Sequence, residues 1–288
     1  MIMPSRWFSG GKGLDDFRAS MLNDDRLRLI HDYPEATDCF AGVQIKGGVC
    51  YFRWERANNG LCRVTSHLGG KIISSIERPL LEDNNDTFIR YNEAISIIEK
   101  VNSLNEPSIK SMISARKPFG LSTTYRGKVN QFEGSVSLYQ NGGIAYIDKS
   151  DISINIELID YYKVFIPPLG SGSDSFPHPI LGKPLVASPN SVCTETYIIA
   201  GSYNNKEEAE NLASYLSTKF LRFLVLQNKP SQHATSKTYK FVPLQNFTST
   251  SDIDWSQSIA DIDRQLYAKY GLSEEEVAFI EGMIKVMG

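Results

Sequence analysis

The residues of this chain that could do chemistry are basic, hydroxyl and aromatic side chains gathered in two short segments. Arg and Lys can neutralise phosphates or bind guanine, hydroxyl groups can contact phosphate oxygens, and aromatic rings can stack on bases. The first segment, SARKPFGLSTTYRGK, supplies Arg116, Lys117, Thr123, Thr124, Arg126 and Lys128 beside Phe119 and Tyr125. The second, NKPSQHATSKTYKFVPL, repeats this chemistry with Lys229, His233, Lys237 and Lys240. Both segments predict contact with a nucleic acid.

The charges of the chain are distributed unevenly along the sequence. The net charge of −3 gives no global sign of nucleic-acid binding. Residues 106–128, the first basic island, contain five bases and one acid, and residues 211–251, the second basic island, contain five bases and no acid. Such islands in an otherwise acidic protein are expected where a limited face meets a polyanion. On charge alone, an ordinary solvated face is the alternative.

Other kinds of site are disfavoured by residue spacing. The four cysteines and four histidines form neither zinc-ligand spacings nor HExxH, so free thiols in a reducing compartment are favoured over a metal site. The segment FSGGKG does not match a phosphate-binding loop, because that motif requires Ser or Thr after the lysine and here Gly13 follows Lys12. No GxSxG motif is present, and the acids of DNNDT and DID lack metal-loop spacing. A self-sufficient hydrolase or metal-dependent nuclease therefore has little support.

The first sixty residues alternate between strand and helix patterns. MIMPSRWF predicts the end of a buried strand stopped by Pro4, with further sequence expected upstream. A helix is predicted from about Leu14, and a strand over residues 27–33. The next segment, FAGVQIKGGVCYF, predicts two strands joined as a hairpin around Gly47-Gly48.

The rest of the chain is first rich in strand patterns and then helical. Residues 61–168 predict short strands and one helix, NEAISIIEKVNSL. One continuous helix is predicted from an Asn205 cap to about Gln227, and two more in the tail, the last with a capping box of Ser273 and Glu276. No apolar run approaches the roughly 20 residues of a membrane span. We therefore expect no membrane partner and a cytoplasmic location.

Several segments, in a fixed order, carry a resemblance to a known family. They are MIMPSRWFSGGKGLDDFR, DCFAGVQIKGGVCYFRWER, SARKPFGLSTTYRG and HATSKTYKFVPLQNF, followed by DIDW and QLYAKYGLSEEEVAFIE. Their succession resembles the C-terminal part of amino (adenine-N6) DNA methyltransferases of restriction-modification systems, the type II group that includes fused restriction and modification enzymes. The resemblance covers nearly the whole chain, although no single motif is very specific.

The resemblance implies an α+β (mixed) fold in three parts. Residues 1–60 would be the C-terminal edge of a doubly wound α/β methyltransferase sheet. Residues 61–250 would be a β-rich domain that recognises the DNA target, and residues 251–288 a C-terminal helical tail. Both basic islands begin within the recognition domain implied in this way.

The resemblance also assigns a role to Phe40. FAGVQIKGGVCYF resembles the family's late motif, whose leading aromatic side chain packs against the flipped-out target base. A flipped base loses its stacking neighbours at a cost of about a few kcal/mol, which an aromatic face partly restores. The family commonly has Phe-Pro where this chain has Phe40-Ala41, so a less rigid loop is expected here.

The family's other functional motifs do not occur in this sequence. A glycine-rich motif for S-adenosylmethionine and an Asn-Pro-Pro-Tyr/Phe motif for the adenine both lie upstream of the strand that MIMPSRW resembles. We therefore expect the chain to bind double-stranded DNA but not to methylate it alone, with no catalytic residue, no metal and no cofactor of its own. S-adenosylmethionine is expected only for the complete enzyme.

A second hypothesis remains open from the sequence. The chain could be an interaction or structural subunit that docks a separate methyltransferase half or chain.

Overall fold

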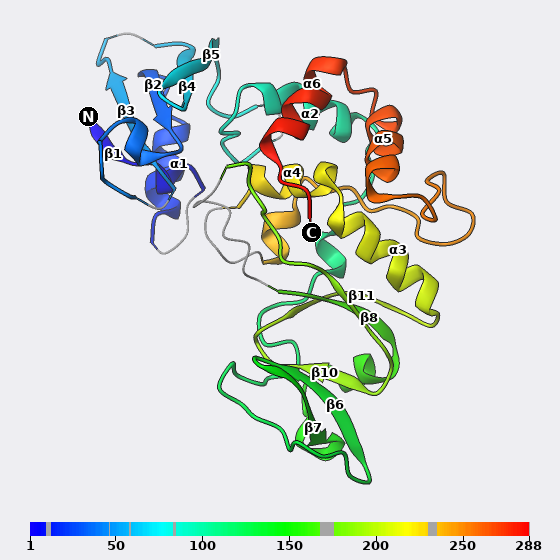
Figure 1. Cartoon of the computed structure of the whole chain (residues 1–288). Coiled ribbons are helices and arrows are strands. Elements are labelled where there is room, and N and C mark those ends of the chain that lie inside the picture. Colours follow the sequence, from blue (N-terminus) through cyan, green and yellow to red (C-terminus); the bar gives the residue numbers. More distant parts are fainter. Residues whose placement is uncertain are drawn as a thin grey trace.

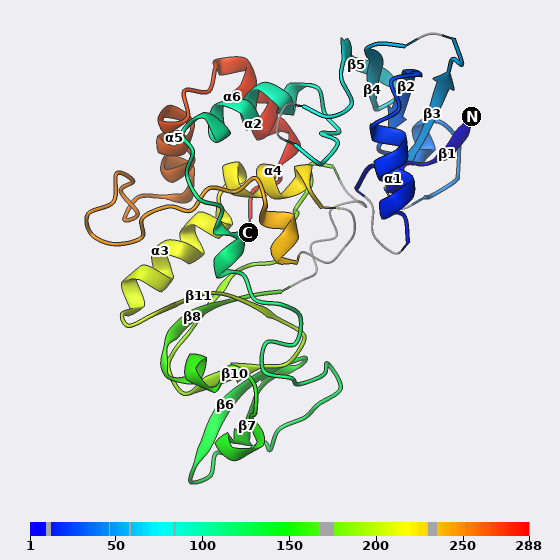
Figure 2. The same cartoon turned by 180° about the vertical axis from the view of Figure 1, so that it is seen from behind.

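The protein has a mixed α/β fold with three sheets and six α-helices among the described residues. The structure, a computed structural model, describes residues 1–9, 13–45, 47–57, 59–82, 85–167, 176–229 and 235–287. Figure 1 shows an N-terminal sheet and a small β unit that project in different directions from a group of helices, and Figure 2 gives the view from behind. His233 lies outside the described residues.

The N-terminal sheet has five strands in the order β1-β3-β2-β4-β5. Strands β2 and β4 pair in parallel, and the other neighbours are antiparallel. Side chains that alternate along the strands pack against Trp7 and Phe8 of η1 and Leu22 of α1. The elements are β1 (Ile2–Pro4), η1 (Ser5–Ser9), α1 (Asp15–Leu22), β2 (Leu27–Tyr33), η2 (Ala36–Asp38), β3 (Val49–Trp54), β4 (Cys62–Leu68) and β5 (Lys71–Arg78).

This sheet differs from the sequence predictions in three respects. It continues to Arg78, because β4 pairs with β2, so a domain boundary at residue 60 would divide the sheet. Strand β1 is not buried but forms an edge, with Ile2 57% exposed. Residues 40–48 contain no strand among those described, so the predicted hairpin is wrong, and only its second segment, β3, is a strand.

Gly48 explains why the chain turns sharply into β3 without a hairpin. Its φ of +76° lies in the left-handed region, and an added Cβ would lie 2.1 Å from the carbonyl oxygen of Tyr33. The glycine therefore lets two backbone segments approach each other closely at the end of β2.

A three-stranded sheet in the order β11-β8-β9 separates the two larger cores. Val164 and Ile166 of β8 face the helices, and Phe165 between them faces the β unit, as strand alternation requires. The β unit is a second three-stranded sheet in the order β10-β6-β7. The elements of the two sheets are β6 (Ser135–Gln140), β7 (Gly143–Asp148), η4 (Lys149–Asp151), η5 (Ile156–Asp160), β8 (Tyr162–Ile166), β9 (Leu185–Ala187), β10 (Ser191–Cys193) and β11 (Ile198–Tyr203).

The helices form one core that includes the C-terminal tail. The helix predicted over residues 205–227 is broken at Thr218, whose extended backbone (ψ 151°) and side chain cap the second half. The predicted capping box of Ser273 and Glu276 is confirmed. The elements are α2 (Glu93–Ser103), η3 (Ile109–Met112), α3 (Lys206–Ser217), α4 (Lys219–Gln227), η6 (Ser236–Tyr239), α5 (Ile259–Lys269) and α6 (Glu274–Met283). Because α5 and α6 share a core with α2, α3 and α4, the tail is part of the helical layer.

Candidate nucleic-acid interface

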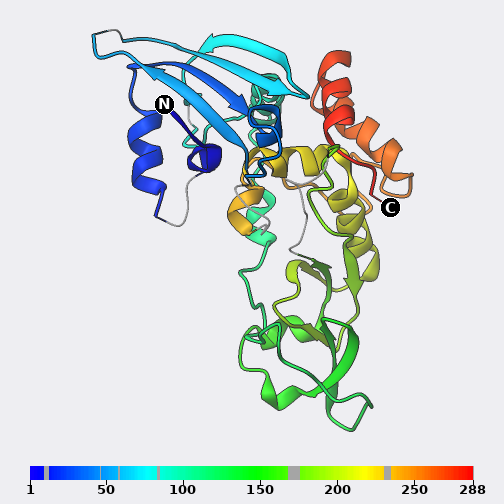
Figure 3. The same ribbon diagram turned by 60° about the vertical axis from the view of Figure 1, so that its left-hand side comes forward.

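The fold joins the two basic islands at one place, although more than eighty residues separate them in sequence. Short helix η3, in the first island, lies against η6, in the second, and Figures 1 and 3 show the two side by side. The Ile109 amide donates to the Val242 carbonyl (2.9 Å), and the Ser108 hydroxyl donates to the Tyr239 carbonyl (2.9 Å). These bonds fix η3 beside η6, which makes the islands neighbours on the surface.

Lys110 and Lys237 are the exposed cations at this junction. Lys110 belongs to η3 and Lys237 to η6. Within the described part of the chain, neither side chain has an ion-pair or hydrogen-bond partner. Both amines are therefore available to an anion. Lys110 belongs to the first island but is not among the predicted contact residues, because the surrounding segment EPSIKSM contains no aromatic residue and no second base.

The other predicted cations of the first island lie on the long loop that follows η3. Arg126 is exposed and donates to the carbonyl oxygens of Thr123 and Tyr125, both at 2.7 Å. Thr123 and Thr124 are exposed, and Lys128 lies 4.3 Å from the ring centre of Phe132. These side chains are presented outward from the β unit, as a binding surface requires.

Arg116 and Lys117 share one carboxylate. An Arg116 Nη2 hydrogen bond reaches Glu195, whose other oxygen lies 3.7 Å from Lys117 Nζ. Both basic side chains are about half exposed, whereas Glu195 is nearly buried. Glu195 carried no signal in the sequence, since it lies some eighty positions away and only the tertiary fold brings it here.

The remaining cations of the second island are more constrained than the sequence predicted. Lys229 Nζ donates to the Ile180 carbonyl at 2.5 Å, and burial lowers the pKa of its amine to about 8. Lys240 Nζ donates to Asn85 Oδ1 at 3.0 Å and pairs with Asp86, whose carboxyl pKa is lowered by that bond. A ligand must therefore compete with internal partners for these two side chains.

Phe40 lies beyond the carboxyl end of β2. Strands β1, β2 and β4 run in one direction, and Tyr33, the last residue of β2, pairs with Val49, the first residue of antiparallel β3. The loop between them therefore lies at the carboxyl edge of the parallel strands, where open α/β sheets bind ligands. Phe40 is 38% exposed in this loop.

Two histidines that the sequence shows as singletons are neighbours in the structure. His31 Nδ1 and His67 Nε2 lie 2.9 Å apart across the pair β2 and β4. Tyr51 stacks on His31, and Tyr33 stacks on His67. Burial lowers the pKa of both imidazoles, and proximity to His67 lowers that of His31 further. Among the described residues, no group of three or more His, Cys, Asp or Glu side chains could hold a metal ion.

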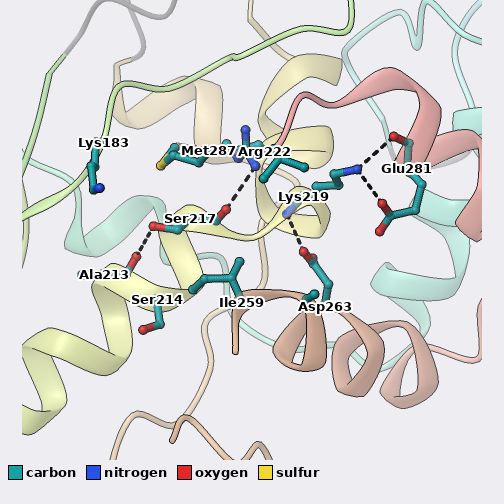
Figure 4. A pocket seen from close by; sticks show the side chains of 12 residues that line it. Lys183, Ala213, Ser214, Ser217, Lys219, Arg222, Ile259, Asp263, Glu281 and Met287 are labelled. Carbon is teal, nitrogen blue, oxygen red and sulfur yellow. Dashed lines mark hydrogen bonds and ion pairs between the residues drawn. The ribbon is translucent and has the colours of Figure 1, made fainter. Parts of the chain in front are cut away.

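A cavity of about 420 Å³ opens between α3, α4, α5 and the C-terminal segment (Figure 4). Asp263 accepts from the backbone amide of Lys219 at 3.0 Å, and burial raises the pKa of the Asp263 carboxyl to about 6. Lys219 Nζ donates to Glu281 at 2.5 Å, and buried Arg222 donates to the Lys285 carbonyl at 2.6 Å. These charged groups hold the helices together, so Lys219 and Arg222 belong to the interior and not to the basic surface.

The described residues contain no helix that is both long and apolar enough to cross a membrane.

Comparison with known proteins gives similarities of three kinds, to a family, to a curated protein and to a solved structure. The family described as Eco57I restriction-modification methylase matches residues 1–40. An "Uncharacterized adenine-specific methylase" of Mycoplasma pneumoniae (strain ATCC 29342 / M129 / Subtype 1) is 26% identical over 128 residues, which are 41% of this chain and 30% of the relative. The crystal structure of the type IIG restriction endonuclease BpuSI aligns with 97% of this chain and 45% of its own, at 13% identity and a TM-score of 0.38.

The match spans less than a third of the length of the curated relative. The family match falls on the segment that holds β1, α1 and β2, up to Phe40, and therefore on the N-terminal sheet and its carboxyl edge. The chain is thus related to the adenine-specific methylases of restriction-modification systems.

Proposed function

We propose that this chain is the DNA-recognition portion of an adenine-N6 DNA methyltransferase. The observation that carries the proposal is the contact of η3 with η6, which makes one basic surface from two islands that are distant in sequence. Phosphate contacts fix a protein on the duplex, and side chains that reach base edges read its sequence. Lys110 and Lys237 would hold phosphates, and the loop with Thr123, Thr124 and Arg126 would reach the grooves.

In the complete enzyme, the adenine would be flipped out of the duplex toward the carboxyl edge of the N-terminal sheet. Phe40 would stack on the extruded base from its exposed position in the loop after β2. The sequence contains no Asn-Pro-Pro-Tyr/Phe motif to hold the exocyclic amine and no residues that we can assign to S-adenosylmethionine. The chain alone would therefore bind DNA without methylating it.

The test is the salt dependence of binding to a short duplex of mixed sequence, measured by fluorescence anisotropy. Each phosphate contact contributes about −0.9 to the slope of log affinity against log salt. The double variant Lys110→Gln/Lys237→Gln removes two unpaired, exposed charges and should make that slope shallower by about 1.8. The matched control, Lys71→Gln/Lys285→Gln, removes two exposed charges that lie outside both islands and have no partner among the described residues, and it should leave the slope unchanged. Absent or salt-independent binding by the native chain would refute the proposal.

A second candidate function rests on the free edge of β1. This strand pairs only with β3 among the described residues, and its first residue, Ile2, is 57% exposed. An unpaired edge strand is a ready site for a strand of another chain. The chain would then dock a separate methyltransferase half, and Ile2→Lys should abolish co-purification with such a partner. A native chain that binds DNA as a monomer and captures no methyltransferase would count against this function.

A further inference from the structure

The turn that carries Arg116 and Lys117 is held rigidly by the protein around it. The backbone amide of Ser114 donates to the Ile199 carbonyl, and the Ser114 hydroxyl accepts from the Ile199 amide, both at 2.8 Å. The Asn155 amide group donates to the Pro118 carbonyl at 2.6 Å. Each bond joins the turn to a part of the chain that is distant in sequence, so the turn has little freedom to adapt to a ligand.

The backbone of the turn is itself in an unusual conformation. Lys117 has a φ of +55°, in the left-handed region that residues other than glycine rarely adopt. The Gly120 amide donates to the Lys117 carbonyl at 2.9 Å, and Phe119 between them is 1% exposed in the core of the β unit. Strained, well-supported backbone of this kind is found at functional sites. The buried Phe119 anchors the turn, while the two basic side chains are presented outward.

Glu195 is fixed at the base of this turn. Its backbone amide donates to the Leu121 carbonyl at 2.9 Å, and its side chain is 11% exposed. Its carboxylate meets both Arg116 and Lys117, whose side chains are 57% and 48% exposed. An anchored carboxylate with two half-exposed cations forms an arrangement of net charge +1, in which both cations already have an anionic partner.

We propose that Glu195 is a positioning residue that restrains Arg116 and Lys117 from sequence-independent contact with DNA phosphates. This inference rests on the proposed function, because it concerns how that surface discriminates among DNA sites. The Glu195 carboxylate already balances part of the positive charge of both cations, so a phosphate gains less electrostatic energy from them than from a lysine or arginine without an anionic partner. The guanidinium of Arg116 carries further donors beyond the one that Glu195 accepts, and these can still reach the O6 and N7 acceptors of guanine.

The experiment compares Glu195→Gln with the native chain in binding to a short duplex of mixed sequence across a range of salt concentrations. Glutamine preserves the shape of the side chain and removes its charge. Release of one or two cations should make the log-log salt slope steeper by about 0.9 to 1.8 and strengthen binding to this duplex. Asp160→Asn is the matched control, because Asp160 pairs with Lys149 on the exposed surface and the variant changes the net charge equally.

Two further variants make the result specific to the turn. Arg116→Ala/Lys117→Ala should hardly change the slope in the native background, but should return the Glu195→Gln slope to the native value. Equal slopes for Glu195→Gln and Asp160→Asn, with the native chain still binding DNA, would overturn this inference and leave the proposed function standing. No binding by the native chain would instead refute the proposed function.

A folding defect does not prevent the test. Thermal unfolding of each variant is measured alongside binding. If Glu195→Gln does not fold, the Arg116→Ala/Lys117→Ala variant decides alone. A slope shallower by about 1.8 in the native background would show that both cations already bind phosphates and would overturn the restraint.

Discussion

The ion pair of Asp32 and Arg90 connects the N-terminal sheet to the helical layer. Asp32 is the last residue but one of β2, the strand that leads into the loop with Phe40, and Arg90 lies just before α2. The Asp32 side chain is 1% exposed and accepts from Arg90 Nε at 2.5 Å, from Arg90 Nη2 at 2.8 Å and from the Ser5 hydroxyl at 2.9 Å. We predict that Arg90→Met strongly destabilises the protein, because it leaves a buried carboxylate with one neutral donor.

The size of the effect follows from burial. Removing one partner of a buried ion pair costs about 3–5 kcal/mol, whereas an exposed pair contributes about 0–1 kcal/mol. Arg63 and Glu77 form such an exposed pair on the same sheet, with side chains 57% and 54% exposed, so Arg63→Met is the matched control. At about 2–4 °C per kcal/mol, Arg90→Met should lower the melting temperature by roughly 10 °C and the control by only a few degrees.

Thermal unfolding followed by tryptophan fluorescence suits this prediction, because Trp7 is buried in the core of the N-terminal sheet. The double variant Asp32→Asn/Arg90→Met removes the stranded charge and should recover most of the lost stability. The reasoning from a buried charge is refuted if the free energy of unfolding of Arg90→Met lies within about 1 kcal/mol of that of Arg63→Met. It is also refuted if the double variant is no more stable than Arg90→Met.

Three other predictions concern the same sheet. Gly48→Ala should unfold at a markedly lower temperature, since its Cβ would lie 2.1 Å from the Tyr33 carbonyl oxygen; melting no lower than the native chain would contradict this close approach. Burial lowers the pKa values of His31 and His67, so the unfolded chain binds more protons than the folded chain as the pH falls. The urea midpoint of unfolding should therefore decrease from about pH 7 to about pH 5. The variant His67→Gln should make this decrease smaller, and an unchanged decrease would contradict the prediction. Phe40→Ala should leave the melting temperature nearly unchanged, because the side chain is exposed. In a longer protein that carries the upstream motifs, the same variant should reduce the fluorescence of 2-aminopurine placed at the target base. An unchanged fluorescence signal would show that Phe40 does not contact the base.

The histidine pair and the basic surface illustrate the same limit of sequence reasoning. Each of the two histidines has no other histidine near it in the sequence. Each basic island is a local cluster, and the sequence around it does not show which distant segment it contacts in the fold. The 2.9 Å approach of His31 to His67 and the contact of η3 with η6 both depend on pairings between distant segments. Local composition identified the charged segments, but it carried no information on which of their side chains are paired internally.

Local patterns in the sequence determined the elements whose signals are themselves local. The strand β2, the helix α2 and the Ser273 capping box follow from alternation, helical spacing and cap residues a few positions apart. The order of short motifs also resembles that of the adenine methylases, and the family match to residues 1–40 agrees with that interpretation. Such features depend on residues close in sequence, where backbone geometry dictates the spacing.

Tertiary structure decided the features that depend on close approach between distant residues. The Gly47-Gly48 pair predicts a hairpin from the sequence, but Gly48 instead allows the backbone carbonyl of Tyr33 to approach closely. Turn propensity depends on neighbouring residues and therefore does not predict this contact. The long α3–α4 helix breaks because Thr218 caps α4 while Asp263, from α5, accepts from the first amide groups of that helix. Glu195 pairs with Arg116 and Lys117 for the same reason. The energy of an ion pair depends on the distance between the charges in space, whereas the sequence gives only their separation along the chain.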